Sequence, residues 1–181
     1  MRYNKYSSEA ILLSRKNYSE ADRILVVFTK GYGKLVLLAK GIRKPKSRKR
    51  GALEIFSRVK FSANKTKTFD LMTEVEIIDS FAKIRSNLKR VALAYYFVEV
   101  VNKITKEEEK NELLYNLLCG YLSKLQYASK LKELRFSFLY QLLVLMGYWP
   151  LGKRMDNPDK TIEYVLERRI NSLKVGISVL H

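Results

Sequence analysis

The sequence predicts an α+β protein in which a small five-stranded β-barrel is followed by an all-α domain. Two observations lead to this prediction. Over residues 1–80, apolar and polar side chains alternate in short runs that are separated by polar or Gly-containing turns. From about residue 81, apolar residues recur at helical spacing instead, so we expect one domain over 1–80 and a second over 81–181.

The first domain contains five predicted strands, at residues 7–14, 23–30, 34–40, 53–63 and 69–78. Gly31, Tyr32 and Gly33 are expected to form a hairpin turn between the second and third strands. In the last strand, the side chains of residues 71, 73, 75 and 77 are expected to share one face. Short strands at this density are typical of a closed barrel of the OB type, a fold that often binds oligonucleotides.

The second domain contains three strongly periodic helical segments. The first ends near Ile104, the second is expected to open at a capping box over residues 105–108, and the third covers 131–146. The tail is less regular, with a helical pattern over 161–170. The longest uncharged stretch falls short of the ~20 apolar residues of a membrane span, so we expect a cytoplasmic protein that does not bind membranes.

The composition argues against an enzyme. The single histidine is His181 and the single cysteine is Cys119, so Cys/His metal motifs, Cys/His nucleophiles and Ser-His-Asp triads are excluded. Residues 31–34 (GYGK) lack the surrounding pattern of a phosphate-binding loop. We therefore expect no catalytic residue, no cofactor and no metal. A site built from carboxylates alone stays open, although the acidic residues of the N-terminal half are scattered along the strands.

The chain is strongly basic, with 35 Lys and Arg against 18 Asp and Glu and a formal net charge of +17. Such a surplus favours polyanions, nucleic acid first. An AT-rich genome would also raise the lysine content, but it would not cluster arginines. Seven of the eleven residues from 40 to 50, in the loop between the third and fourth strands, are Lys or Arg. We predict that this loop binds phosphates through Lys40, Arg43, Lys44, Lys46, Arg48, Lys49 and Arg50.

The neighbouring strand extends the predicted DNA-binding surface. Phe56, Arg58 and Lys60 alternate onto one face, and an aromatic ring beside two cations suits a single strand. Further candidates are Arg15, Lys16, Tyr18, Tyr32 and Lys34. Other interpretations stay open. The basic run can be a solvated loop or a nuclear localisation signal, Phe56 can be buried where the barrel packs on its neighbour, and Tyr32 can be a simple turn residue.

The same residues resemble a known family. Segments 18–23 (YSEADR), 29–34 (TKGYGK) and 39–48 (AKGIRKPKSR) are similar to the N-terminal signature of the bacterial recombination mediator family RecO. Segments 94–99 (AYYFVE) and 147–150 (GYWP) resemble its helical motifs, and the likeness covers residues 1 to about 151. Family members often carry a four-cysteine zinc site after the second motif. This chain has no cysteine there, so we expect a metal-free domain.

The resemblance implies binding and annealing of single-stranded DNA without nucleotide hydrolysis, with double-stranded DNA as a further ligand, at the nucleoid. It also implies cooperation with RecR in loading RecA onto strands coated by single-stranded-DNA-binding protein, in DNA repair and recombination. The acidic, hydrophobic tail of that coating protein would suit a basic helical domain, where Lys132 and Arg135 are candidate contacts. Two alternatives stay open: an adaptor that recruits acidic protein tails, and an RNA-binding OB module.

Overall fold

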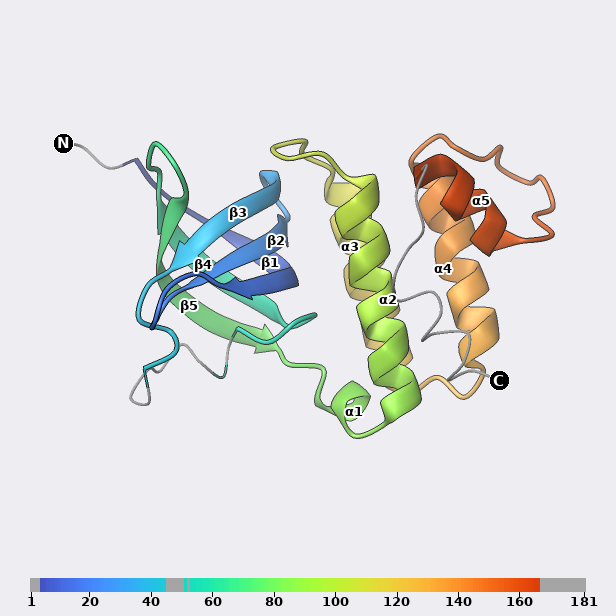
Figure 1. Ribbon diagram of the computed structural model, residues 1–181. Coiled ribbons are helices and arrows are strands. Elements are labelled where there is room, and N and C mark those ends of the chain that lie inside the picture. The colour runs from blue at the N-terminus through green and yellow to red at the C-terminus, as the bar shows by residue number, and fades with distance from the viewer. Residues whose placement is uncertain (1–3, 45–50, 52, 167–181) are drawn as a thin grey trace. The chain divides into compact units, whose positions relative to one another are not determined.

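A computed structural model describes residues 4–44, 51 and 53–166 of the protein. The chain forms two compact units (Figure 1), one of Met1–Ser80 with Thr105–Tyr115 and one of Phe81–Ile104 with Asn116–His181. The first unit is a β-barrel and the second is helical, so the predicted fold class is confirmed. The sequence pattern did not predict that a segment after residue 104 would return to the barrel unit.

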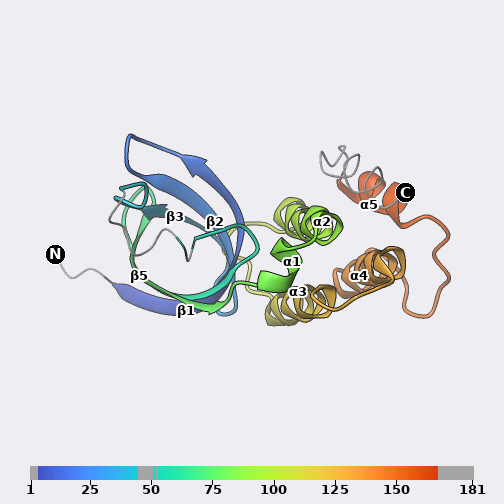
Figure 2. The same cartoon turned by 90° about the horizontal axis from the view of Figure 1, so that it is seen from below.

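The barrel is built from β1 (Lys5–Asn17), β2 (Arg23–Thr29), β3 (Gly33–Ala39), β4 (Arg58–Asn64) and β5 (Asp70–Asp79). These strands close in the order β1-β2-β3-β5-β4 around a common interior (Figure 2). All neighbouring strands are antiparallel except β3 and β5, which run parallel and pair at only two positions. The first half of β1 pairs with β4 and its second half with β2, and a register shift after Leu12 helps the strand to bend.

Side chains that alternate along the strands fill the barrel interior. The buried core includes Ala10, Leu12, Leu25, Val27, Leu35, Leu37, Val59, Phe61, Ala63 and Met72. In β2, β3 and β4 the buried positions are every second residue over most of the strand, as a barrel wall with one inner and one outer face requires. Burial of these apolar side chains is the main force that holds the barrel closed.

In β5 the expected alternation is interrupted. The register against β4 shifts between Met72 and Glu74, which leaves Thr73 as the extra residue of a β-bulge. Met72 lies in the core, and Val75 packs against the core from beyond the bulge. The single face predicted for residues 71, 73, 75 and 77 is therefore wrong, because one inserted residue exchanges the two faces of a strand.

The helical elements are α1 (Ala82–Arg85), α2 (Leu88–Ile104), α3 (Glu112–Leu125), α4 (Leu131–Leu145) and α5 (Pro158–Leu166). The rings of Phe97, Tyr121 and Phe138 form the centre of the helical unit, with centroids 4.0–6.1 Å apart. Arg90 donates hydrogen bonds to the carbonyl oxygens of Gln126 and Ala128 just beyond α3. None of the helices in the described part of the chain is both long enough and apolar enough to cross a membrane.

The segment before α3 packs on the barrel instead of beginning a helix. The capping box predicted over residues 105–108 is wrong, because α3 is capped by Asn111, whose Oδ1 accepts the N–H of Leu114 at 2.9 Å. The N–H of Glu108 donates to the carbonyl oxygen of Lys34 at 2.9 Å. Since β3 pairs with β5 only near its end, this segment covers an edge of β3 that would otherwise be open.

Gly33 is a position at which the backbone excludes a side chain. Its φ is +72°, and a Cβ there would overlap the backbone of Glu109. We predict that Gly33→Ala lowers the free energy of unfolding by at least about 2 kcal/mol. A thermal melt followed by circular dichroism should then show a Tm lower by about 4 °C or more.

Gly120 provides the matched control. It is exposed inside α3, and a Cβ added there would meet nothing within 4 Å. Gly120→Ala should leave Tm unchanged or raise it, because alanine favours a helix over glycine. Equal Tm values for Gly33→Ala and the wild type would contradict the close packing of the segment before α3 against β3.

Candidate nucleic-acid interface

The outer surfaces of β2 and β3 form an apolar face. Ile24 of β2 lies opposite Leu38 of β3, and Val26 lies opposite Val36, all on the side that alternates with the core. These four side chains are half-buried. Lys16 of β1 pairs with Ile24, so a cation borders the apolar row. In OB barrels this face, with the β1–β2 and β4–β5 loops, is where oligonucleotides bind.

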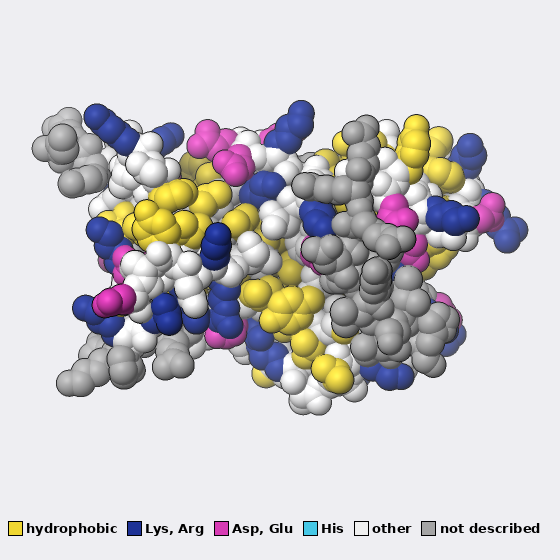
Figure 3. Space-filling view, viewed as in Figure 1, with side chains coloured by type: hydrophobic (Ala, Val, Ile, Leu, Met, Phe, Trp, Pro, Cys, Tyr) yellow, Lys and Arg dark blue, Asp and Glu magenta, His cyan; other side chains and the backbone are white. Residues whose placement is uncertain are grey.

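Two aromatic rings from those loops meet. Tyr18 in the β1–β2 loop and Phe69 at the end of the β4–β5 loop make an edge-to-face contact, with ring centroids 6.0 Å apart and an interplanar angle of 78°. Tyr18 is 57% exposed, which leaves its ring accessible for stacking on a base. Figure 3 shows apolar side chains gathered over the barrel, with Lys and Arg side chains around them.

The first part of the basic loop is fixed against the β1–β2 loop. Oδ1 of Asp22 accepts the N–H of Gly41 at 2.8 Å. The backbone N–H of Arg43 donates to the carbonyl oxygen of Ala21 at 2.9 Å. Nη1 of the same arginine donates to the carbonyl oxygen of Ser19 at 3.0 Å. These three hydrogen bonds therefore hold the start of the loop close to Tyr18.

The predicted loop cations begin from this fixed point. Ile42 is fully buried in the barrel core, while the flanking Lys40, Arg43 and Lys44 are exposed. The remaining predicted cations of the loop lie outside the described residues: Lys46, Arg48, Lys49 and Arg50. The structure thus places three of the seven predicted cations beside the β1–β2 loop.

Arg15 anchors the other end of the loop. Its Nη1 donates to the carbonyl oxygen of Leu53 at 3.2 Å and to Oε1 of Glu54 at 2.6 Å. Arg15 pairs with the core residue Leu25, so it continues the inner face of the barrel wall. Its guanidinium therefore forms its hydrogen bonds within the barrel unit, at the end of the basic loop. It does not lie on the outer face of β2 and β3.

Phe56 does not present an exposed ring, and the structure contradicts its predicted stacking role. The side chain is fully buried, and its φ of 58° belongs to a turn instead of a strand. Its N–H donates to the carbonyl oxygen of Leu12 at 2.8 Å. The strand predicted over 53–63 begins only at Arg58, so the expected alternation does not reach Phe56.

The cations of β4 lie away from the face of β2 and β3, because β4 is placed between β1 and β5. Nη2 of Arg58 donates to Oε2 of Glu9 at 2.6 Å, and its Nε donates to the hydroxyl of Tyr115 at 3.3 Å. Lys60 is exposed, with Glu9 and Glu76 as its cross-strand neighbours. The structure therefore does not bring these two cations together with the basic loop.

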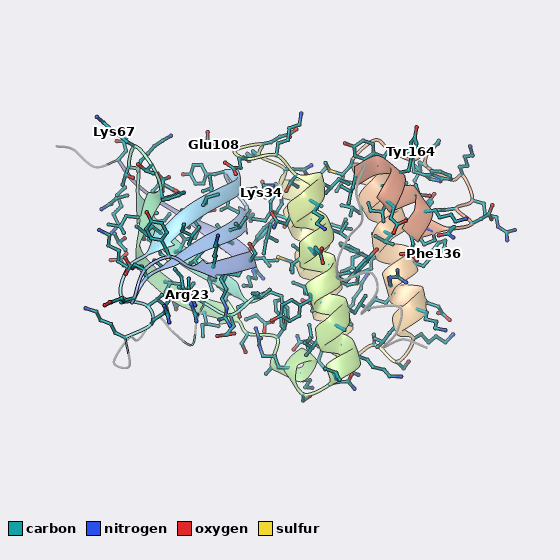
Figure 4. The ribbon with its side chains drawn as sticks, viewed as in Figure 1. Arg23, Lys34, Lys67, Glu108, Phe136 and Tyr164 are labelled. Atoms are coloured by element: carbon teal, nitrogen blue, oxygen red, sulfur yellow. The ribbon has the colours of Figure 1, made fainter. Side chains whose placement is uncertain are left out.

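Lys34, also a predicted DNA contact, fastens the segment before α3. Its Nζ donates to the carbonyl oxygen of Thr105 at 2.6 Å, next to the backbone hydrogen bond from Glu108. Figure 4 shows Lys34 and Glu108 on these neighbouring segments, and Lys67 on the β4–β5 loop. Lys34 therefore has a structural role, because it holds the segment before α3 against β3.

The two predicted partner contacts of the helical unit differ in exposure. Lys132 is exposed on α4. Arg135 forms an ion pair with Asp159, lies over the ring of Tyr96 at 4.9 Å, and keeps only 13% side-chain exposure. Within the described residues, no group of three or more His, Cys, Asp or Glu side chains is placed to hold a metal ion.

Sequence reasoning missed Phe69 and the outer face of β2 and β3. Phe69 follows two lysines in a segment interpreted only as a turn and a strand start. The available signal was the apolar run in each of β2 (RILVVFT) and β3 (GKLVLLA), because these runs hold more apolar residues than a strand with one buried face needs.

Comparison with known proteins agrees with this architecture. The family profile described as "Recombination protein O N terminal" matches residues 1–81, and that described as "Recombination protein O C terminal" matches residues 85–153. The DNA repair protein RecO of Pelotomaculum thermopropionicum is 33% identical over 149 residues, which cover 82% of this chain and 58% of the relative. The DNA repair protein RecO of Desulforamulus reducens is 34% identical over 174 residues, which cover 96% of this chain and 64% of the relative.

The fold and its basic face define the class, which is an OB-barrel protein with a helical second unit. Within that class, the two profile matches and the relatives show that the chain belongs to the RecO family, as its motifs indicated. The chain spans about three-fifths of the length of these two curated relatives.

The ion pair between Glu9 and Arg58 makes a prediction about pH. The guanidinium of Arg58 donates to Glu9 and holds the pKa of that carboxyl below its ordinary value. A carboxylate with a lowered folded pKa stabilises the fold above its unfolded pKa, near 4.3. This stabilisation is lost as the pH falls through the folded pKa. We predict that Glu9→Gln loses less stability than the wild type between about pH 6 and pH 3, measured by urea denaturation.

Glu20→Gln, at an exposed position of the β1–β2 loop, serves as the matched control and should retain the wild-type pH dependence. If Glu9→Gln and the wild type lost stability equally on acidification, the ion pair would have no part in the acid sensitivity of the barrel.

Proposed function

We propose that the chain binds single-stranded DNA across the outer face of β2 and β3, and that it acts in DNA repair and recombination. One observation carries this proposal: the Tyr18–Phe69 pair, a half-buried apolar face and the root of the basic loop belong to the same side of the barrel. Rings and apolar side chains bind bases in any sequence, while cations bind the phosphates between them.

Charge supports this ligand. Exposed cations flank the face from two directions, with Lys16, Lys40, Arg43 and Lys44 on one border and Lys65 and Lys67 in the β4–β5 loop on the other. The predicted loop adds like charges whose mutual repulsion a polyanion would relieve. Counterions released from DNA would favour binding further and make the affinity depend steeply on salt.

The same geometry suits strand annealing. A surface that holds a strand by its phosphates and by ring faces leaves the hydrogen-bonding edges of the bases open to a second strand. Such annealing requires no nucleotide hydrolysis. The curated relatives are named DNA repair proteins. We further propose the finer role that the family resemblance implies, which is loading of RecA together with RecR.

A second function is favoured by a cleft of about 550 Å³ in the helical unit. It is lined by Phe136, which is 39% exposed, by Tyr140 and Lys153, and by the ion pair of Arg154 with Asp156. Aromatic walls beside Lys153 fit an acidic, hydrophobic peptide, such as the tail of single-stranded-DNA-binding protein. The residues of this cleft are candidate contacts for such a tail in place of Arg135. Recruitment of the tail-bearing protein would complement DNA binding.

The proposed function predicts a salt dependence. Titration of fluorescent oligothymidine should give a slope of log affinity against log salt near −3.5, for about 5 phosphate contacts. Replacing Arg43, Lys44, Lys46, Arg48, Lys49 and Arg50 by Ala should flatten that slope, while circular dichroism shows an unchanged fold. An unchanged slope in this variant would remove the loop from the DNA-binding site.

The Tyr18–Phe69 pair predicts a loss of DNA affinity that does not depend on salt concentration. Tyr18→Leu and Phe69→Leu should each weaken oligothymidine binding by about 1 kcal/mol or more, roughly fivefold, because base stacking is lost. The salt slope should be retained, since neither ring carries charge. Tyr164→Leu, at a tyrosine of α5 that is 86% exposed, is the matched control and should bind like the wild type.

A matched RNA oligonucleotide competes in the same assay. Tighter binding of RNA than of DNA would contradict the proposed function and favour the RNA-binding alternative, because the 2′-hydroxyl distinguishes the two strands. Wild-type affinity for oligothymidine in both Tyr18→Leu and Phe69→Leu would show that DNA binds elsewhere.

A further inference from the structure

The barrel carries a cavity of about 440 Å³ at the β2–β3 hairpin, distinct from the outer face of these strands. Two tyrosines line it, Tyr6 of β1 and Tyr32 of the hairpin, with ring centroids 5.0 Å apart and an interplanar angle of 61°. Tyr32 is 44% exposed. The cavity therefore offers an accessible aromatic ring supported from the side by a second one.

Both rings are held in place. The hydroxyl of Tyr6 donates to Oδ2 of Asp70 at 2.6 Å, and its ring makes an edge contact with the core residue Phe61. Burial and the bond to Asp70 raise the pKa of Tyr6, so its hydroxyl stays protonated. The N–H of Tyr32 donates at 2.9 Å to Oγ1 of Thr29, a buried residue at the end of β2. The hairpin thus presents Tyr32 from a rigid support.

The charges around the cavity suit a neutral ring next to a phosphate. Three lysines line it, Lys5, Lys65 and Lys110, against two carboxylates, Asp70 and Glu108, which leaves a net charge of +1. Both oxygens of Asp70 already accept hydrogen bonds, Oδ2 from Tyr6 and Oδ1 from the N–H of residue 66. Lys5 forms an ion pair with Glu74 at 3.3 Å, so Lys65 and Lys110 are the groups best able to bind an anion here.

The cavity lies next to a groove that leads toward the proposed DNA-binding face. This groove, of about 400 Å³, shares four lining residues with the cavity: Leu35, Lys65, Asp70 and Glu108. The groove is also lined by Val36 and Phe69, which belong to the outer face and its aromatic pair. A strand that leaves the face along the β4–β5 loop would therefore arrive at Tyr32.

We propose, on the basis of the proposed function, that this cavity receives one unpaired nucleobase of the bound strand. The base stacks on the ring of Tyr32, and Lys65 and Lys110 bind the phosphates beside it. A base held in this way is withdrawn from pairing, unlike the bases on the outer face. The cavity thus marks one end of the stretch that a complementary strand can anneal to.

A fluorescent base tests this inference. Oligothymidines are prepared with a single 2-aminopurine at successive positions and a separate dye at one end. Dye anisotropy measures binding, and 2-aminopurine emission reports stacking. With the wild type, one position should be quenched more than its neighbours. Tyr32→Leu should abolish that position-specific quenching and weaken binding roughly fivefold, whereas Tyr32→Phe, which keeps the ring, should retain both.

Two further variants complete the test. Lys110→Gln should lower the steepness of the salt dependence by about 0.7, the contribution of one phosphate of a single strand. Tyr164→Leu should leave binding and quenching unchanged. Binding without any difference in the quenching profile between the wild type and Tyr32→Leu would overturn the cavity inference and leave the proposed function intact. Absence of oligothymidine binding would overturn both.

Discussion

Closure of the barrel through β1 is the constraint on which the candidate site depends. This strand of 13 residues pairs with β4 over its first half and with β2 over its second half. It therefore separates β4 from β2 and leaves the outer surfaces of β2 and β3 as one continuous face. Burial of the apolar inner face fixes the register of these pairings, because a slip by one residue would turn the core side chains outward. The cations of β4 consequently lie on another side of the barrel.

The start of β5 connects the two aromatic features. Phe69 contacts Tyr18 beside the outer face of β2 and β3, whereas the next residue, Asp70, holds Tyr6 in the hairpin cavity. Consecutive residues near a strand start point to opposite sides, so one short segment serves both features. This segment also pairs with β3 at Leu37, which ties its position to the core. The β4–β5 loop, with its lysines, thus borders the whole proposed path of the strand.

Local sequence pattern predicted the elements well and their special positions poorly. Alternation and helical periodicity located the five strands, α2 and α4, because both patterns follow from burying one face. The turn at Phe56 was missed because it depends on a hydrogen bond to Leu12, far back along the chain. The β-bulge at Thr73 was missed because it shows only in the register of β5 against β4, not in the residue pattern of β5 itself. Thr105 has the residue type that is expected at a helix N-cap. The segment that begins there instead forms its backbone hydrogen bond with the edge of β3.

The candidate site was predictable only in part for the same reason. A dense cluster of cations is visible in the sequence, and its described members, Lys40, Arg43 and Lys44, are exposed as expected. Partners of Arg15 and Arg58 are 39 and 49 residues away, so their structural roles leave no local signal. Chemical-shift mapping of the isotopically labelled protein with oligothymidine tests the central claim most directly. We expect the shifted amides to gather in β2, β3 and the β4–β5 loop. Shifts confined to β4 or to the helical unit would contradict the proposed interface.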